Sequence, residues 1–132
     1  MTIPVGFRFQ SATDIASFDE SLVGVVPKDL STADSLLQAV AKALLFPGYF
    51  GHNWNALYDC LRDFHWTSQK DVVLIHSDLP ALDDDELKIY LKTLQEASAS
   101  WKPGESHTFI AVFDPSLKHA ILSMLQVELN ER

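Results

Sequence analysis

Residues 46–61 read FPGYFGHNWNALYDCL, a stretch that begins as a loop and continues as a helix. Its first half combines aromatic side chains with proline and glycine, a composition that favours a loop over a helix or strand. In its second half Asn55 and Asp59 are four residues apart, so on a helix they lie on the same face, one turn from each other. The stretch therefore predicts a docking edge in which an aromatic loop leads into a polar helix face.

The predicted helix runs from about Trp54 to Phe64, with Asn53 as its N-cap. The period of an α-helix places its apolar side chains on one face. These are Leu57, Cys60, Leu61 and Phe64. On the opposite side lie Asn55, Asp59 and Arg62, with Trp54 and Tyr58 at the flanks. One side is expected to hold the fold, and the other to face solvent or a partner.

The surface around this helix combines aromatic rings with amide and carboxylate groups. Tyrosine and tryptophan are enriched among the residues that dominate protein–protein interfaces, which favours an interface for Tyr49 and Tyr58. For Phe50 and Trp54, covering the edge of the core is an equally good interpretation.

Three short apolar runs, residues 22–26, 72–75 and 108–113, show no polar/apolar alternation. Such runs are typical of strands buried on both faces of a parallel sheet, and the segments between them are long enough for helical crossovers. The sequence predicts one α/β domain with a small parallel sheet of about three strands. Residues 7–9 (Phe-Arg-Phe) are a candidate for an extra strand at the sheet edge.

Three further helices are predicted from periodicity and capping signals. The first covers about residues 32–45, with Ser31 as N-cap and Pro47 preventing continuation. The second covers about 84–101 and starts with a cluster of acidic residues that suits the positive end of the helix dipole. The last begins at Pro115, after Asp114 as cap.

Composition points to a single domain with an acidic surface. The chain has 132 residues, 47% of them hydrophobic, with 18 acidic residues against ten Lys and Arg and a formal net charge of −8. The basic residues are scattered and form no stripe, which argues against nucleic-acid binding. A negative field favours a basic partner, although acidity also serves solubility alone.

The remaining sequence features argue against secretion, membrane insertion and catalysis. A lone Cys60 rules out an intrachain disulfide, and no signal peptide or run of membrane-spanning length is visible, so a cytoplasmic protein is expected. The five histidines lack the spacing of a zinc motif, and neither a phosphate-binding loop nor a GxSxG elbow occurs. No cofactor, metal site or catalytic residue is predicted, and Cys60 is interpreted as a small hydrophobe.

The stretch at residues 46–61 resembles the barstar family, intracellular inhibitors of barnase-type ribonucleases. The family pattern is a leucine-proline, paired aromatics and glycine, then a helix reading Asn-Leu-Asp-Ala-Leu-Trp-Asp. The similarity covers about residues 22–113 and leaves 1–20 as an N-terminal extension and 115–130 as an additional helix. It implies a three-layer fold with a three-stranded parallel sheet, and an inhibitory surface on the loop and helix around 47–62.

The resemblance also implies roles for single residues. Asp59 matches the carboxylate that enters the ribonuclease active site, Tyr49 a contact aromatic and Asn53 a contact amide. Glu96 matches an outlying acidic contact. The full set expected to bind a basic ribonuclease or related toxin is Tyr49, Phe50, Gly51, Asn53, Asn55, Tyr58, Asp59 and Glu96.

Three departures from the family pattern affect the choice of partner. Asn55 stands where the prototype has aspartate, His52 replaces an acid and Tyr58 replaces tryptophan, so the docking face loses up to two negative charges. These changes favour a ribonuclease other than barnase, or a different basic toxin. Two alternatives stay open: a regulatory module that uses the same face on a non-nuclease partner, and an enzyme built around His52, Asp59 and Glu96.

Overall fold

The structure is a computed structural model, and it describes residues 6–11, 20–48 and 50–130. Its elements, in chain order, are β1 (Phe7–Phe9), β2 (Leu22–Val26), α1 (Ala33–Ala43), α2 (Trp54–Leu61), β3 (Asp71–His76), α3 (Asp84–Ser100), β4 (Thr108–Phe113), η2 (Pro115–Leu117) and α4 (Lys118–Asn130).

The four strands form one sheet in the order β1-β4-β3-β2, and every neighbouring pair is parallel. Residues 72–76 of β3 are all buried, as expected for a central strand covered on both faces. Phe7–Phe9 pairs with residues 111–113 of β4, which confirms the additional edge strand. The predicted α/β class is therefore confirmed, with four strands in the sheet rather than about three.

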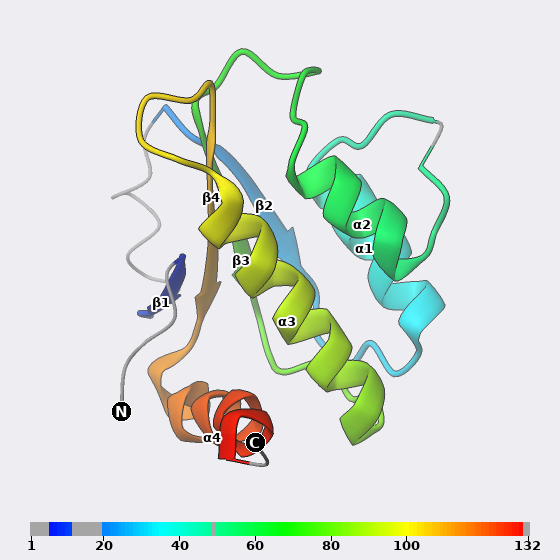
Figure 1. The fold of residues 1–132 in the computed structure, drawn as a ribbon. Helices are drawn as coiled ribbons and strands as arrows, with labels where there is room; N and C mark the ends of the chain where they lie inside the picture. The colour runs from blue at the N-terminus through cyan, green and yellow to red at the C-terminus, as the bar shows by residue number, and fades with distance from the viewer. Residues whose placement is uncertain (1–5, 12–19, 49, 131–132) are drawn as a thin grey trace.

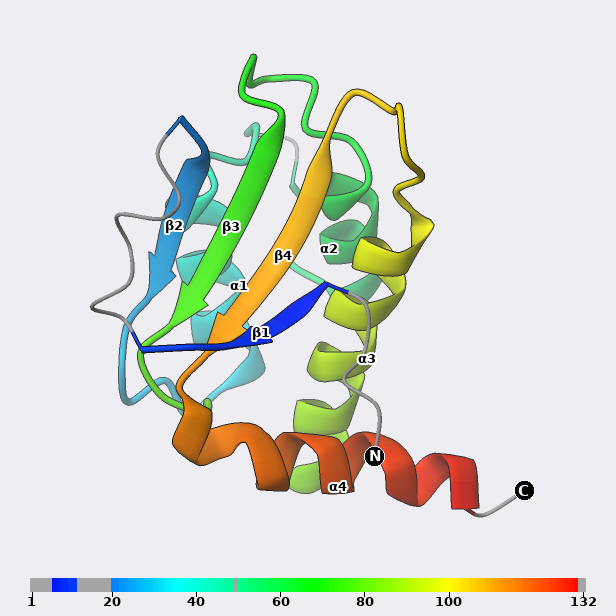
Figure 2. The same cartoon turned by 90° about the vertical axis from the view of Figure 1, so that its left-hand side faces the viewer.

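Helices α1, α2 and α3 lie on one face of the sheet, and α4 lies beyond the carboxyl ends of β3 and β4 (Figure 1, Figure 2). The main core fills the space between the sheet and these helices, with Leu36, Leu57, Leu74 and Leu91 fully buried. Helix α4 contributes Ile121 and Leu125 to the same core. The opposite face of the sheet carries a smaller buried cluster, which consists of Val73, Ile75 and Val112.

The helix starts follow local hydrogen bonds, and two of them differ from the expectation. The N-cap of α1 is Thr32 rather than Ser31, because Thr32 and Ser35 form a reciprocal capping box. The Asp114 carboxylate accepts the Ser116 N–H as a cap should, but residues 115–117 form a 3₁₀ turn and α4 itself starts at Lys118. Asp83 caps α3 through the Glu86 N–H.

Candidate protein-binding site

The start of α2 is held by Asn53, which confirms the predicted N-cap. Its Oδ1 accepts the Ala56 N–H at 2.8 Å, and its Nδ2 donates to the Gly51 carbonyl at 3.3 Å. Because both ends of the amide are engaged within the chain, Asn53 fixes the helix start and the preceding loop together. The loop also bends at His52, whose φ of 53° is in the left-handed region.

Helix α2 has one buried side and one exposed side, as its period predicted. Its predicted core residues are all buried. They are Leu57, Cys60 and Leu61 within α2, and Phe64 beyond its end. The helix ends at Leu61 rather than near Phe64, whose φ of 54° is not helical. Arg62, expected on the exposed side, is half-buried over the Trp101 ring. Asn55 and Asp59 are exposed, and Trp54 and Tyr58 are half-buried between the two sides. The Trp101 indole N–H donates to the Leu61 carbonyl at 2.9 Å and thereby fixes the end of α2 to the end of α3.

A groove of about 360 Å³ lies between α2 and α3. Its lining residues are Trp54, Asn55, Tyr58 and Asp59 from α2, and Ile89, Thr93 and Glu96 from α3. The groove thus brings together four of the residues predicted to bind a partner, although Glu96 is far from the other three in the sequence. Among the described residues, neither the Asp59 nor the Glu96 carboxylate has a hydrogen bond or ion pair. Both remain available to a cation from outside the chain.

The other predicted residues lie on or near the loop before α2. Gly51 is exposed, whereas Phe50 is only 7% exposed and packs in the core. The Phe50 ring contacts Phe46 at a centroid distance of 5.0 Å and His52 at 4.9 Å. Phe50 therefore packs on the core side of the loop and supports its conformation. Tyr49 lies outside the described residues.

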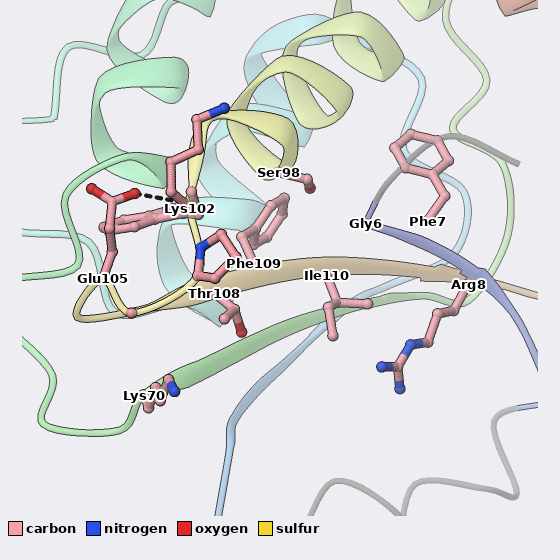
Figure 3. A pocket seen from close by; sticks show the side chains of 13 residues that line it. Gly6, Phe7, Arg8, Lys70, Ser98, Lys102, Glu105, Thr108, Phe109 and Ile110 are labelled. Carbon is pink, nitrogen blue, oxygen red and sulfur yellow. Dashed lines mark hydrogen bonds between the residues drawn. The ribbon is translucent and has the colours of Figure 1, made fainter.

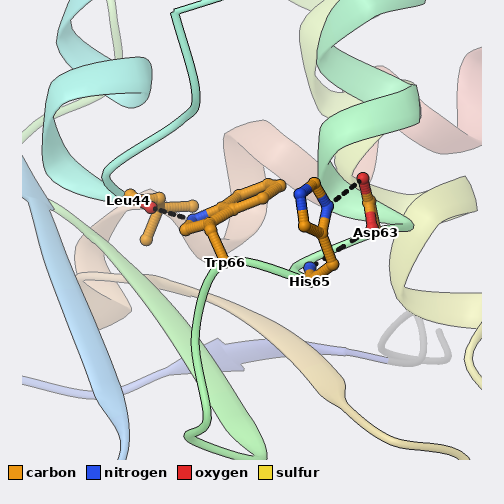
Figure 4. Close-up of polar contacts among 4 residues, drawn as sticks. All are labelled: Leu44, Asp63, His65 and Trp66. Atoms are coloured by element: carbon orange, nitrogen blue, oxygen red, sulfur yellow. Dashed lines mark hydrogen bonds and ion pairs between the residues drawn. The ribbon is translucent and has the colours of Figure 1, made fainter.

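The segment after α2 supports the same loop. The Trp66 ring meets Phe46 edge-on at 5.6 Å, and its indole N–H donates to the Leu44 carbonyl at 3.0 Å. Next to it, His65 Nδ1 lies 2.8 Å from the Asp63 carboxylate, within hydrogen-bond distance (Figure 4). Sequence reasoning missed Trp66, because nothing in the local pattern links it to a loop some 20 residues earlier.

The cysteine of α2, Cys60, does not have the surroundings of a nucleophile. Burial, followed by the charges of Asp63 and Asp59, raises the pKa of the Cys60 thiol to about 11, so it stays protonated and a poor nucleophile. The described His, Cys, Asp and Glu side chains form no group of three or more that could hold a metal ion. None of the described helices has the length and apolar character needed to cross a bilayer.

A second cavity, of about 450 Å³, borders β1, β4 and the end of α3 (Figure 3). Its charged lining residues are Arg8, Lys70, Lys102 and Glu105. The Glu105 carboxylate accepts the Lys102 backbone N–H. With three cations against one carboxylate, this cavity has the opposite charge to the groove between α2 and α3. Of these two sites, the groove is the one whose charge is complementary to a basic partner.

Comparison with known proteins identifies the family of the chain. No curated protein matches the chain. The model of the family described as Barstar (barnase inhibitor) matches residues 23–114. This range runs from the second residue of β2 to just past the end of β4, and it leaves β1 and α4 outside. The match covers well over half of the chain, which belongs to the barstar family.

Proposed function

We propose that this chain inhibits a basic ribonuclease by covering its active site with the loop and helix around 47–62. The observation that carries the proposal is the position of Asp59. It is exposed beside the groove between α2 and α3, on a helix whose opposite side is buried. A ribonuclease active site is a cationic cleft shaped for phosphate, and a carboxylate on a rigid helix can accept paired hydrogen bonds from its Arg and His side chains.

In this proposal the other contact residues surround Asp59. Glu96 adds a second carboxylate from α3, while Asn55 and Tyr58 add an amide and an aromatic ring from α2. Gly51 and Asn53 extend the surface along the loop, and the buried Phe50 supports it. Tyr49, which the family resemblance implies as a contact aromatic, is included in the proposal. The family description, barnase inhibitor, supports the same kind of partner.

The proposal is tested by measuring inhibition of RNA cleavage by a panel of purified barnase-type ribonucleases. Removing one partner of a desolvated charge pair costs about 3–5 kcal/mol, so Asp59→Ala should raise the inhibition constant by about 100-fold or more. Its melting temperature should stay close to that of the wild type, because Asp59 is exposed and has no ion pair with a described residue. Association with the wild type should slow as salt is added.

The matched control is Glu105→Ala, which removes an exposed carboxylate at the second cavity. This variant should inhibit like the wild type. Equal inhibition by Asp59→Ala and the wild type would contradict the proposal.

One observation favours a second candidate, a regulatory module for a basic partner without nuclease activity. Asn55 and His52 leave the docking face less acidic than the family pattern. The face therefore attracts the cationic cleft of a ribonuclease less strongly. In that case none of the ribonucleases would be inhibited, and Asp59→Ala would instead weaken capture of the other partner.

A further inference from the structure

The groove between α2 and α3 contains an exposed isoleucine in addition to its carboxylates. Ile89 is 43% exposed, and the other described large hydrophobic residues exposed to a similar degree are Val25 at 48% and Leu45 at 63%. Of these three, only Ile89 lines the groove. An exposed aliphatic side chain is common on protein surfaces, so the informative feature is that Ile89 lines the same groove as Asp59 and Glu96.

On α3 the groove residues form a single stripe. Ile89, Thr93 and Glu96 follow the i, i+4, i+7 spacing of one helix face. The Thr93 hydroxyl donates to the Ile89 carbonyl at 2.7 Å, so its hydrogen is used within the helix. With a rise of about 1.5 Å per residue, Ile89 and Glu96 are about 10 Å apart along the axis.

Helix α2 runs in the same direction beside this stripe. Its first residue, Trp54, contacts Tyr90 at a centroid distance of 6.0 Å, and the carbonyl of its last residue, Leu61, accepts the Trp101 indole N–H. Trp54 therefore lies near Ile89, while Asp59 lies farther along, toward Glu96. The groove has one apolar end and one acidic end.

From this arrangement we infer that the ribonuclease partner places an apolar side chain against Ile89, next to the cations that meet Asp59 and Glu96. The inference rests on the proposed function. Carboxylates attract any basic cleft, and burial of the isoleucine stabilises only complexes whose partner has an apolar group at the matching position. Ile89 is thus a specificity-determining residue, and the partner it fits has a basic cleft with an apolar side chain on its rim.

The test compares Ile89→Ala with Val25→Ala, which shortens a similarly exposed β-branched side chain outside the groove. Dissociation constants are measured by calorimetry against each barnase-type ribonuclease that the wild type inhibits. Ile89→Ala should weaken the tightest complex by about 5- to 20-fold, a typical loss for an interface side chain of this size. The salt dependence of binding should stay unchanged, and Val25→Ala should bind like the wild type. Urea unfolding of both variants confirms that they fold.

The outcomes separate the inference from the function on which it rests. Wild-type affinity of Ile89→Ala, together with weak binding of Asp59→Ala, overturns the inference and leaves the proposed function intact. The inference is also overturned if Val25→Ala weakens binding as much as Ile89→Ala. Wild-type affinity of Asp59→Ala, or a lack of inhibition of every ribonuclease, removes the proposed function and the inference with it.

Discussion

The two sides of α2 separate stability from recognition within one short helix. On one side Leu57 and Leu61 are fully buried in the main core. On the other, Asn55 and Asp59 are exposed and border a groove with no described basic residue. Because the two sides share a backbone, the core side fixes where the polar side points. Substitutions on the buried side should therefore change stability, and those on the exposed side should change binding.

The largest expected effect is on the buried side. Leu57→Ala removes a fully buried side chain and leaves a cavity, so the free energy of unfolding should fall by about 2–5 kcal/mol. Asn55→Ala, two residues away on the exposed side, should change it by less than about 0.5 kcal/mol. Urea unfolding followed by circular dichroism measures both. Similar losses for the two variants would mean that the sides of α2 are not energetically distinct.

Helix α3 also combines an exposed stripe with a buried polar contact, which joins Tyr90 of α3 to His76 of β3. The Tyr90 hydroxyl lies 2.6 Å from His76 Nε2, while His76 Nδ1 lies 3.1 Å from the Val112 carbonyl. These partners fit a neutral imidazole in which Nδ1–H donates to the carbonyl and Nε2 accepts from the tyrosine. Burial lowers the pKa of His76 from 6.5 to about 4. The imidazole ring also stacks on Phe113.

This depressed pKa makes stability depend on pH. Between pH 6.5 and 4 the unfolded chain binds a proton at His76 that the folded chain does not, so the stability present above pH 6.5 is lost as the pH falls. The loss from this group should reach about 2 kcal/mol by pH 5. Unfolding at pH 7 and pH 5 should show a smaller pH effect in His76→Gln than in the wild type. His119→Gln, at an exposed histidine, should keep the full effect, and an unchanged effect in His76→Gln would contradict the assignment.

The sequence predicted which residues of α2 face the core and which face solvent, because the helical period is a local property. It also predicted the strands, whose uninterrupted apolar runs need no knowledge of their partners. The sequence favours Ser31 as the N-cap of α1, because serine is the slightly better cap in isolation. The reciprocal bond between Thr32 and Ser35 shifts the cap by one residue.

The features that the sequence did not predict depend on distant segments. The groove needs Ile89 and Thr93, which come from a helix that starts 23 residues after the end of α2, and no pattern in residues 46–61 indicates them. Phe50 reads as either a surface or a core aromatic until Phe46 and Trp66 are seen to pack beneath the loop.

A smaller effect on the free energy of unfolding is expected at Asn53, the residue that caps the start of α2. Asn53→Ala removes the cap, and the free energy of unfolding should fall by about 1 kcal/mol. Asn53→Asp keeps an oxygen that can accept the Ala56 N–H and should retain most of the stability. Thermal unfolding distinguishes the two variants. Equal losses would show that the bond from Nδ2 to the Gly51 carbonyl, and not the cap, holds the helix start.

The smallest effect concerns Leu45, which lies just before the docking loop. The Phe46 N–H donates to the Ala41 carbonyl and the Leu45 N–H to the Lys42 carbonyl, the pattern of a Schellman motif. Leu45 occupies the left-handed position of this motif, with a φ of 60°, where glycine has no steric cost. Leu45→Gly should therefore raise the free energy of unfolding by about 0.5 kcal/mol.

Leu45→Ala separates the two possible causes of this gain, because it removes the exposed apolar side chain but keeps the Cβ atom. If it stabilises the protein as much as Leu45→Gly, then exposure of the leucine and not its backbone conformation is responsible. Inhibition assays on the same variants also test the boundary of the binding surface. If both variants inhibit like the wild type, Leu45 lies outside the binding surface. If both inhibit more weakly, the binding surface extends beyond the groove to the end of α1.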